Sequence, residues 1–455
     1  MVNEVLTITM LALLALGVFS GFPVALVLTT TGFLAFIAAV SIGETDFGHL
    51  GLIYLRVRGV LTNEAVQFTS VPLLIFLGLV LNASGIAETL FRTIGQLLKS
   101  VPGRYAVATL LIGLILAPAA GVIGASVVTV ALVAYGPMLR SGYPASAAGA
   151  AVAASGALGV VFPPAILLFF VANVFQLRFA LMYAALVVPV LLLVLLFSIY
   201  FAITLRNRVE VPLSDQTKPT IRDVLSVIVA IGVIAAIPLS IVAGVATLSE
   251  AAGIGVFGGL LVTAFRGRMT LNLLNKTIVR TASMTSMVFF IVIGATIFSL
   301  GFNLLDGPNI LFLWIDSFDL GRWATLTLLL SIILVLGFVF DWIEILLVFL
   351  PILLPIFGQL DFADHVGTAY FANIWLAGLI ALALQTSFLT PPFGYALFFA
   401  KMAAPPGVNL ADIYRGAGPL VVIEVLMIGA MAGWPKLITW LPALVLSRSD
   451  SVLLN

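Results

Sequence analysis

The two proline pairs of this chain, Pro163-Pro164 and Pro391-Pro392, are the residues that most clearly predict chemistry. Each pair lies inside an uncharged segment, of 37 and 35 residues respectively, and Leu-Phe-Phe follows shortly after each pair. Because proline removes a backbone donor and clashes with the preceding turn, neither segment can form one continuous helix. A broken helix exposes carbonyls at one end, which suit Na⁺, and amides at the other, which suit a carboxylate. We therefore expect ligands for an ion and an organic anion at both breaks.

Candidate ligands flank these breaks or lie upstream of them at matching positions. Hydroxyls beside a break add oxygen ligands, and a glycine-rich helix start offers further carbonyls. The expected Na⁺ ligands are Gly124, Ser126, Gly156, Gly159, Phe162, Pro163, Asp341, Thr386, Thr390 and Pro391. The expected substrate-binding residues are Ser155, Asn173, Gln385, Ser387 and Gly394. The segment Gly121–Ser126 has the pattern Gly-x-x-Gly-x-Ser. The alternative explanation of this pattern is close packing of the helix against a neighbouring helix.

Three acidic residues fall in apolar surroundings. Asp341 and Glu344 follow an uncharged run of 18 residues. Either they are ordinary helix-end charges at the membrane interface, or they are buried at a cost that marks a functional site. Asp341 is the stronger candidate, because it falls where the first half carries Gly121–Ser126. Glu424 also lies within a span, and we expect a charge on a supporting helix or at the lipid interface, with a proton carrier as the alternative.

Composition places these residues in an integral membrane protein. Of the 455 residues, 62% are hydrophobic and 9% are charged, and the mean hydropathy is +1.25, whereas soluble proteins carry about 25% charged residues. At about 20 apolar residues per span, the chain allows about 10 to 16 crossings. Continuous apolar runs favour helices over the alternating segments of a barrel. The N-terminus lacks a basic start and a cleavage motif, so we expect it to be retained as the first span.

Several classes of function are excluded by what the sequence lacks. The 20 basic and 19 acidic residues give no reason to expect a nucleic-acid partner. No cysteine is present for disulfides or thiol chemistry, and two histidines are too few for a multi-histidine metal site. Neither a phosphate-binding loop nor a hydrolase motif occurs, so we expect no enzyme and no covalently bound cofactor. An ion gradient is then the expected source of energy.

The repeated Pro-Pro segments indicate two homologous halves, roughly 22–205 and 245–441. Their polar connection carries several basic residues, which predicts a cytoplasmic location. In each half an upstream apolar stretch, starting at Pro72 and at Met287, supports the repeat. We divide the chain into scaffold helices (1–70), a first repeat (71–205), a linker (206–223), a second repeat (224–441) and a tail (442–455).

Two segments of the first half are expected to face a partner. Residues 65–84 predict a span, and residues 86–101 alternate charged and apolar positions at helical spacing. Such a pattern is typical of an amphipathic helix that lies at the membrane interface. We expect both segments to offer apolar surface to a small membrane subunit.

Together, these motifs resemble the large membrane subunit (DctM-like) of the tripartite ATP-independent periplasmic (TRAP) transporters. The resemblance spans essentially the whole chain. Its carriers are GALGVVFPPAILLFF, LTPPFGYALFF, ATLSEAAGIG (246–255), PMLRSGYP (137–144) and DIYRGAGP (412–419). It implies an all-α polytopic protein with an inverted-repeat, elevator-type fold, two re-entrant helical hairpins and broken helices.

The resemblance also implies a function and partners. Such proteins take up organic acids with Na⁺ across the bacterial inner membrane, together with a periplasmic substrate-binding protein and a small four-helix membrane subunit. The chain lacks a fused small subunit, so we expect a separate one, with membrane lipid around both.

Departures from the family pattern bear on the substrate. The first half reads Gly124-Ala125-Ser126 where the family often has Gly-Ser-Ser, and Trp342 follows Asp341 where many members have proline. The second half is also longer between its prolines, over 355–391 against 137–163. These features are similar to the branch assigned to 2-oxo acids and other monocarboxylates. The alternatives are an ion-coupled anion transporter outside this family, a channel or membrane scaffold subunit, or the permease of an ATP-driven importer.

Overall fold

The computed structural model describes residues 2–62, 68–120, 123–206, 220–392 and 394–453. Within these ranges the chain is helical and forms no strands, which confirms the predicted all-α polytopic fold. Nine described helices are long and apolar enough to cross a membrane, or up to ten if a pair bent by 68° counts as one span. Shorter apolar helices account for much of the remainder, among them the elements that flank the proline pairs.

The first half contains ten α-helices in its described part. Their bounds are α1 (Val2–Phe19), α2 (Val24–Ser41), α3 (Leu50–Thr62), α5 (Ser70–Ala83), α6 (Ile86–Leu97), α7 (Arg104–Ala120), α8 (Ile123–Arg140), α9 (Ala145–Val160), α10 (Ile166–Val174) and α11 (Phe179–Thr204). A 3₁₀ turn, Phe47–His49, precedes α3. A turn that contains Gly21, Phe22 and Pro23 separates α1 from α2.

The second half follows with a similar order of helices. Their bounds are α12 (Ile221–Val242), α13 (Leu248–Phe265), α14 (Leu271–Leu304), α15 (Gly307–Asp316), α16 (Arg322–Leu336), α17 (Trp342–Glu344), a π-helical turn η2 (Ile345–Phe349), α18 (Leu350–Phe357), α19 (Ala363–Val366), α20 (Ala369–Ser387), α21 (Tyr395–Met402), α22 (Leu410–Gly433) and α23 (Lys436–Leu453). The extra length noted between the prolines of this half forms the connection that contains α19.

Backbone conformation shows the repeat directly. Among the described residues twelve have positive φ, six in each half, and they punctuate the helices in the same order. They are Gly21, Gly43, Gly85, Gly103, Gly142 and Gln176, and then Gly244, Gly267, Asp306, Asp319, Gly367 and Gly407. The correspondence therefore begins with α1 and α12, one helix earlier than the boundaries near 22 and 245. The stretches from Pro72 and Met287 do belong to equivalent helices, α5 and α14, but in a shifted register.

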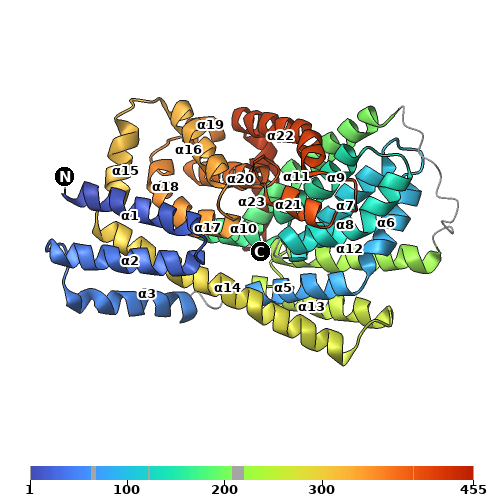
Figure 1. Cartoon of the computed structure of the whole chain (residues 1–455), viewed down its shortest axis with the longest axis horizontal. Coiled ribbons are helices and arrows are strands. Elements are labelled where there is room, and N and C mark those ends of the chain that lie inside the picture. The colour runs from blue at the N-terminus through green and yellow to red at the C-terminus, as the bar shows by residue number, and fades with distance from the viewer. Residues whose placement is uncertain (1, 63–67, 121–122, 207–219, 393, 454–455) are drawn as a thin grey trace.

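The two halves exchange packing partners. Helix α2 packs along α14 of the second half, and α13 packs in the same way along α5 of the first half. In Figure 1, α14 runs along the lower part of the molecule, from the α13 end towards α15. Gly32 allows the α2–α14 approach, since a Cβ atom there would lie 2.6 Å from the backbone nitrogen of Phe298. Small residues let helices approach closely where lipid supplies no hydrophobic drive.

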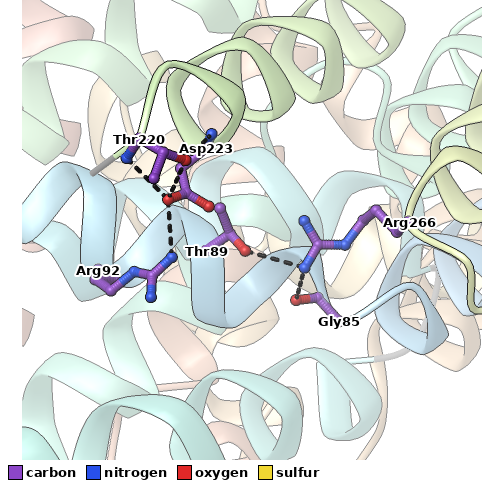
Figure 2. A network of polar contacts seen from close by, with 6 residues as sticks. All are labelled: Gly85, Thr89, Arg92, Thr220, Asp223 and Arg266. Atoms are coloured by element: carbon purple, nitrogen blue, oxygen red, sulfur yellow. Dashed lines mark hydrogen bonds and ion pairs between the residues drawn. The ribbon is translucent and has the colours of Figure 1, made fainter. Parts of the chain in front are cut away.

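A polar network ties α6 to the second half (Figure 2). Arg92 of α6 forms an ion pair with Asp223 of α12, with Nη2 and Oδ2 3.0 Å apart. Arg266, at the end of α13, donates from Nη2 to the Gly85 carbonyl at 3.2 Å and to the Thr89 hydroxyl at 3.0 Å. The short connection between α5 and α6 is thereby fixed against α13.

The apolar faces of α5 and α6 are covered by the chain itself. Helix α5 packs against α7, α13 and α14, and α6 packs against α7 and α12. The buried residues of α6 include Leu90, Phe91 and Ile94. The prediction that residues 65–84 and 86–101 offer apolar surface to a partner is therefore wrong for the described part of these segments apart from Leu97, which is 68% exposed, because helices distant in sequence occupy those faces.

Candidate functional site

Each proline pair separates two helices of a hairpin. In the first half, Pro163 and Pro164 lie between α9 and α10, and in the second, Pro391 and Pro392 lie between α20 and α21. Residues 148–160 of α9 are all buried, as are residues 374–387 of α20. The breaks predicted from the prolines are confirmed, and they lie at the ends of two of the most deeply enclosed helices.

The hairpins interlock across the two halves. The second arm of the later hairpin, α21, packs on α8 and α9, and the Tyr135 hydroxyl of α8 donates to the Ala400 carbonyl at 3.0 Å. In return α10 packs on α17, η2 and α20, where the rings of Phe170 and Trp342 lie 5.7 Å apart between centroids. Each break is therefore held by elements of the opposite half.

The first-half candidates lie on the buried sides of α8 and α9. Ser126 is 1% exposed, and its Oγ has no hydrogen-bond partner in the described part of the chain. The Ser155 hydroxyl, also buried, donates to the Val152 carbonyl at 2.7 Å. Gly124 faces the Phe399 ring of α21 so closely that a Cβ atom would lie 2.6 Å from it. The candidate Gly121 lies outside the described residues.

The remaining first-half candidates surround the break itself. Gly156, Gly159 and Pro163 are buried, whereas Phe162 and Asn173 are half-buried. The Phe162 carbonyl accepts from the Ala165 amide at 2.9 Å, so this oxygen is partly engaged within the turn. Asn173 lies at the far end of α10 from the break. Asn173 is therefore separated from the break by most of the length of α10.

In the second half three hydroxyls lie at the end of α20 and in the turn directly before the break. Thr386, Ser387 and Thr390 each donate to a carbonyl three or four residues earlier, at 2.9, 2.6 and 2.7 Å. Donation leaves the oxygen lone pairs available to a cation. Pro391 is half-buried, and Gly394 is buried against the Phe388 carbonyl, where a Cβ atom would lie 2.6 Å away.

Asp341 caps a helix that starts at the position matching α8. Its carboxylate accepts from the Trp342 amide at 2.8 Å, and the Asp341 amide donates to Glu344 Oε2 at 3.2 Å, which completes a capping box. Both acidic residues are half-buried. Sequence reasoning missed the partner from α21, Tyr395, whose hydroxyl donates to the Val339 carbonyl at 3.1 Å. No sequence signal pairs Tyr395 with this segment, because the contact joins residues 56 positions apart.

Glu424 differs from its prediction. It was expected on a supporting helix or at the lipid interface, but it is 1% exposed and Gln385 Nε2 donates to its Oε1 at 2.7 Å. Gln385, a substrate-binding candidate, is completely buried, and its own Oε1 and Glu424 Oε2 have no partner among the described residues. The expectation of a lipid-facing charge is wrong, because α22 packs this face against α9 and α20.

The family model described as "Tripartite ATP-independent periplasmic transporter, DctM component" matches residues 7–437. The C4-dicarboxylate TRAP transporter large permease protein DctM of Pseudomonas aeruginosa is 25% identical over 397 residues, which cover 85% of this chain and 87% of that protein.

Two further relatives and one solved structure are similar to the chain. The sialic acid large permease SiaM of Vibrio cholerae is 24% identical, covering 83% of this chain and 86% of that protein. The 2,3-diketo-L-gulonate large permease YiaN of Escherichia coli is 24% identical, covering 80% and 84%. The YdaH transporter of Alcanivorax borkumensis shares the fold with a TM-score of 0.57 at 14% identity, over 85% of this chain and 89% of that one.

Proposed function

This chain belongs to the DctM component family of tripartite ATP-independent periplasmic transporters, and on that premise we propose that it couples Na⁺ entry to uptake of a monocarboxylate such as a 2-oxo acid. The chain is a large permease subunit for organic acid uptake in the bacterial inner membrane. The relatives named for C4-dicarboxylate, sialic acid and 2,3-diketo-L-gulonate all handle carboxylates. The departures of this sequence from the family pattern favour a monocarboxylate as the substrate.

The observation that carries Na⁺ coupling is a pair of oxygen-bearing helix starts at matching positions. In the first half the buried Ser126 hydroxyl lacks a partner among the described residues, and in the second Asp341 places a carboxylate at the start of α17. The helices that carry these starts pack on the hairpins, α8 on α9 and α21, and α17 on α10. A dehydrated cation gains from a carboxylate in a site of low dielectric constant. We therefore assign one Na⁺ to each hairpin region.

Movement of the hairpins as one unit would supply alternating access. The exchange of α10 and α21 between halves joins both hairpins, α8 and α17 into a single packed body. The α2–α14 and α5–α13 pairs, joined by contacts between α5 and α14, form a second body. Sliding of the first body along the second carries both ion sites and the substrate together, as in an elevator mechanism.

Two partners complete the proposed system. A periplasmic binding protein delivers the acid, and a small four-helix membrane subunit packs beside this chain. Exposed apolar side chains on α12 and α13, such as Leu239, Phe257 and Phe265, offer surface to that subunit or to lipid. Loss of activity or stability without the small subunit supports the assignment, and full uptake by this polypeptide alone contradicts it.

The test is uptake in proteoliposomes that contain both membrane subunits, with the binding protein outside. A panel of radiolabelled 2-oxo acids and dicarboxylates is offered with an inward Na⁺ gradient. We expect 2-oxo acid accumulation that disappears when K⁺ replaces Na⁺. Equal accumulation under a pure proton gradient contradicts Na⁺ coupling, and equilibration without accumulation favours a channel.

A further inference from the structure

A cavity of about 550 Å³ separates the two bodies of helices. Helices α5 and α14 form one wall, and α8 and α21 form the other. Its lining residues are Leu79, Asn82, Ala83, Gly124, Ala125, Val128, Thr129, Lys276, Thr277, Arg280, Met284, Phe399 and Met402. This volume falls in the range that holds a small organic ligand.

The polar part of the lining is positively charged. Lys276 and Arg280 are four residues apart on α14, so their side chains project on the same side of that helix. Among the described residues that line the cavity, none is an aspartate or a glutamate. Neither cation forms a salt bridge or a hydrogen bond with any residue in the described ranges. The Asn82 side chain, also in the lining, has an Oδ1 that lacks a partner there.

The other wall contains the candidate ion segment and apolar surface. Gly124, at the start of α8, lines the cavity two residues before Ser126, whose Oγ has no hydrogen-bond partner among the described residues. Phe399 and Met402 of α21, with Met284 of α14, supply apolar contacts. An occupant with an acidic group towards α14 and a carbon skeleton towards α21 matches this division.

We propose that this cavity binds the transported organic acid, with its carboxylate held by Lys276 and Arg280. The proposal rests on the proposed function and names its anion site. Arginine can bind a carboxylate through two parallel hydrogen bonds, and lysine adds a point charge. Because the cations belong to α14 and Gly124 belongs to α8, the bound acid touches both bodies at once. The acid is therefore bound at the interface of the two bodies before they slide, and its carboxylate leaves the α14 cations when the first body carries it away.

The absence of cysteine from the natural chain makes a direct test practical. Thr129→Cys places a thiol in the cavity wall, and Ser20→Cys places one in the exposed, uncharged turn between α1 and α2. The holo-complex in proteoliposomes is treated with an anionic sulfonatoethyl methanethiosulfonate or a cationic trimethylammonium-ethyl analogue. Rates at Thr129→Cys are divided by those at Ser20→Cys to remove intrinsic reactivity.

We expect the normalised rates to favour the anionic reagent on the order of tenfold or more, because both cations attract it and repel its analogue. The double substitution Lys276→Gln/Arg280→Gln should abolish that preference. The matched swap Lys276→Arg/Arg280→Lys keeps both charges and should retain it. Replacing chloride by acetate at constant ionic strength should slow the anionic reagent in the cavity but not in the turn.

Three results would overturn the proposal: equal normalised rates with the native cations, no reaction with either reagent at Thr129→Cys, or no effect of acetate. The second result means that the cavity is closed to water. Labelling requires neither a gradient nor transport. A charge preference without Na⁺-dependent uptake therefore contradicts only the proposed coupling, whereas normal uptake with no preference contradicts only the anion site.

Discussion

The buried pair Gln385 and Glu424 permits a prediction with a definite sign. Gln385 Nε2 donates to Glu424 Oε1 at 2.7 Å, and both side chains are at most 1% exposed. Removing one partner of a buried hydrogen bond costs about 1–3 kcal/mol, and more when the stranded group is charged. Replacing both partners by apolar groups of similar shape is nearly neutral. We therefore expect Gln385→Leu/Glu424→Leu to be more stable than either single variant.

The coupling free energy between Gln385 and Glu424 also indicates whether Glu424 is charged. A hydrogen bond to a charged group contributes about 1.5–3 kcal/mol, whereas one between neutral groups contributes about 0.5–1.5 kcal/mol. A double-mutant cycle isolates this pairwise contribution. A coupling free energy above about 1.5 kcal/mol indicates a carboxylate, and a smaller one indicates the protonated acid.

The assay is reversible unfolding of the purified protein in mixed micelles, with four proteins in the cycle. Val422→Leu, at an exposed position of the same helix, is the control and should leave the unfolding free energy unchanged within about 0.5 kcal/mol. The reasoning fails if the two single effects add within about 0.5 kcal/mol, because independent sites behave in that way.

Three further predictions concern the ion sites and the helix crossing. Asp341→Asn should raise the Na⁺ concentration for half-maximal uptake more than Glu344→Gln does, because Asp341 supplies the negative charge at the start of α17; coincident uptake curves would make this break purely structural. Thr390→Val removes a hydroxyl beside the second break and should raise the same concentration, while calorimetry shows unchanged substrate affinity of the binding protein. Gly32→Ala should destabilise the protein by about 1–3 kcal/mol through overpacking, since the added Cβ would lie 2.6 Å from a backbone nitrogen of α14. Gly253→Ala has open space around it and should be neutral or slightly stabilising in thermal unfolding, so equal losses in the two variants would contradict the close crossing.

Local signals were sufficient for the architecture of the hairpins. Proline acts on its own turn and the residue before it, so Pro163 and Pro391 predicted the breaks wherever the surrounding helices lay. Composition was equally sufficient to predict a membrane protein, because the chain has too few charged residues to cover the surface of a soluble protein. Recurrence of the Pro-Pro segment revealed two halves, although the register of α5 against α14 required the positive-φ residues Gly85 and Asp306.

Only the tertiary structure decided which apolar faces meet. In a membrane, lipid-facing and protein-facing side chains are both apolar, so hydrophobic periodicity gives little information about the buried side. The sequence therefore could not show that α5 and α6 are covered by α7, α12 and α13, or that α21 crosses to α8. The same ambiguity concealed the burial of Glu424 against Gln385. The cationic cavity likewise exists only because α14 brings Lys276 and Arg280 opposite Gly124, more than 140 positions earlier in the chain.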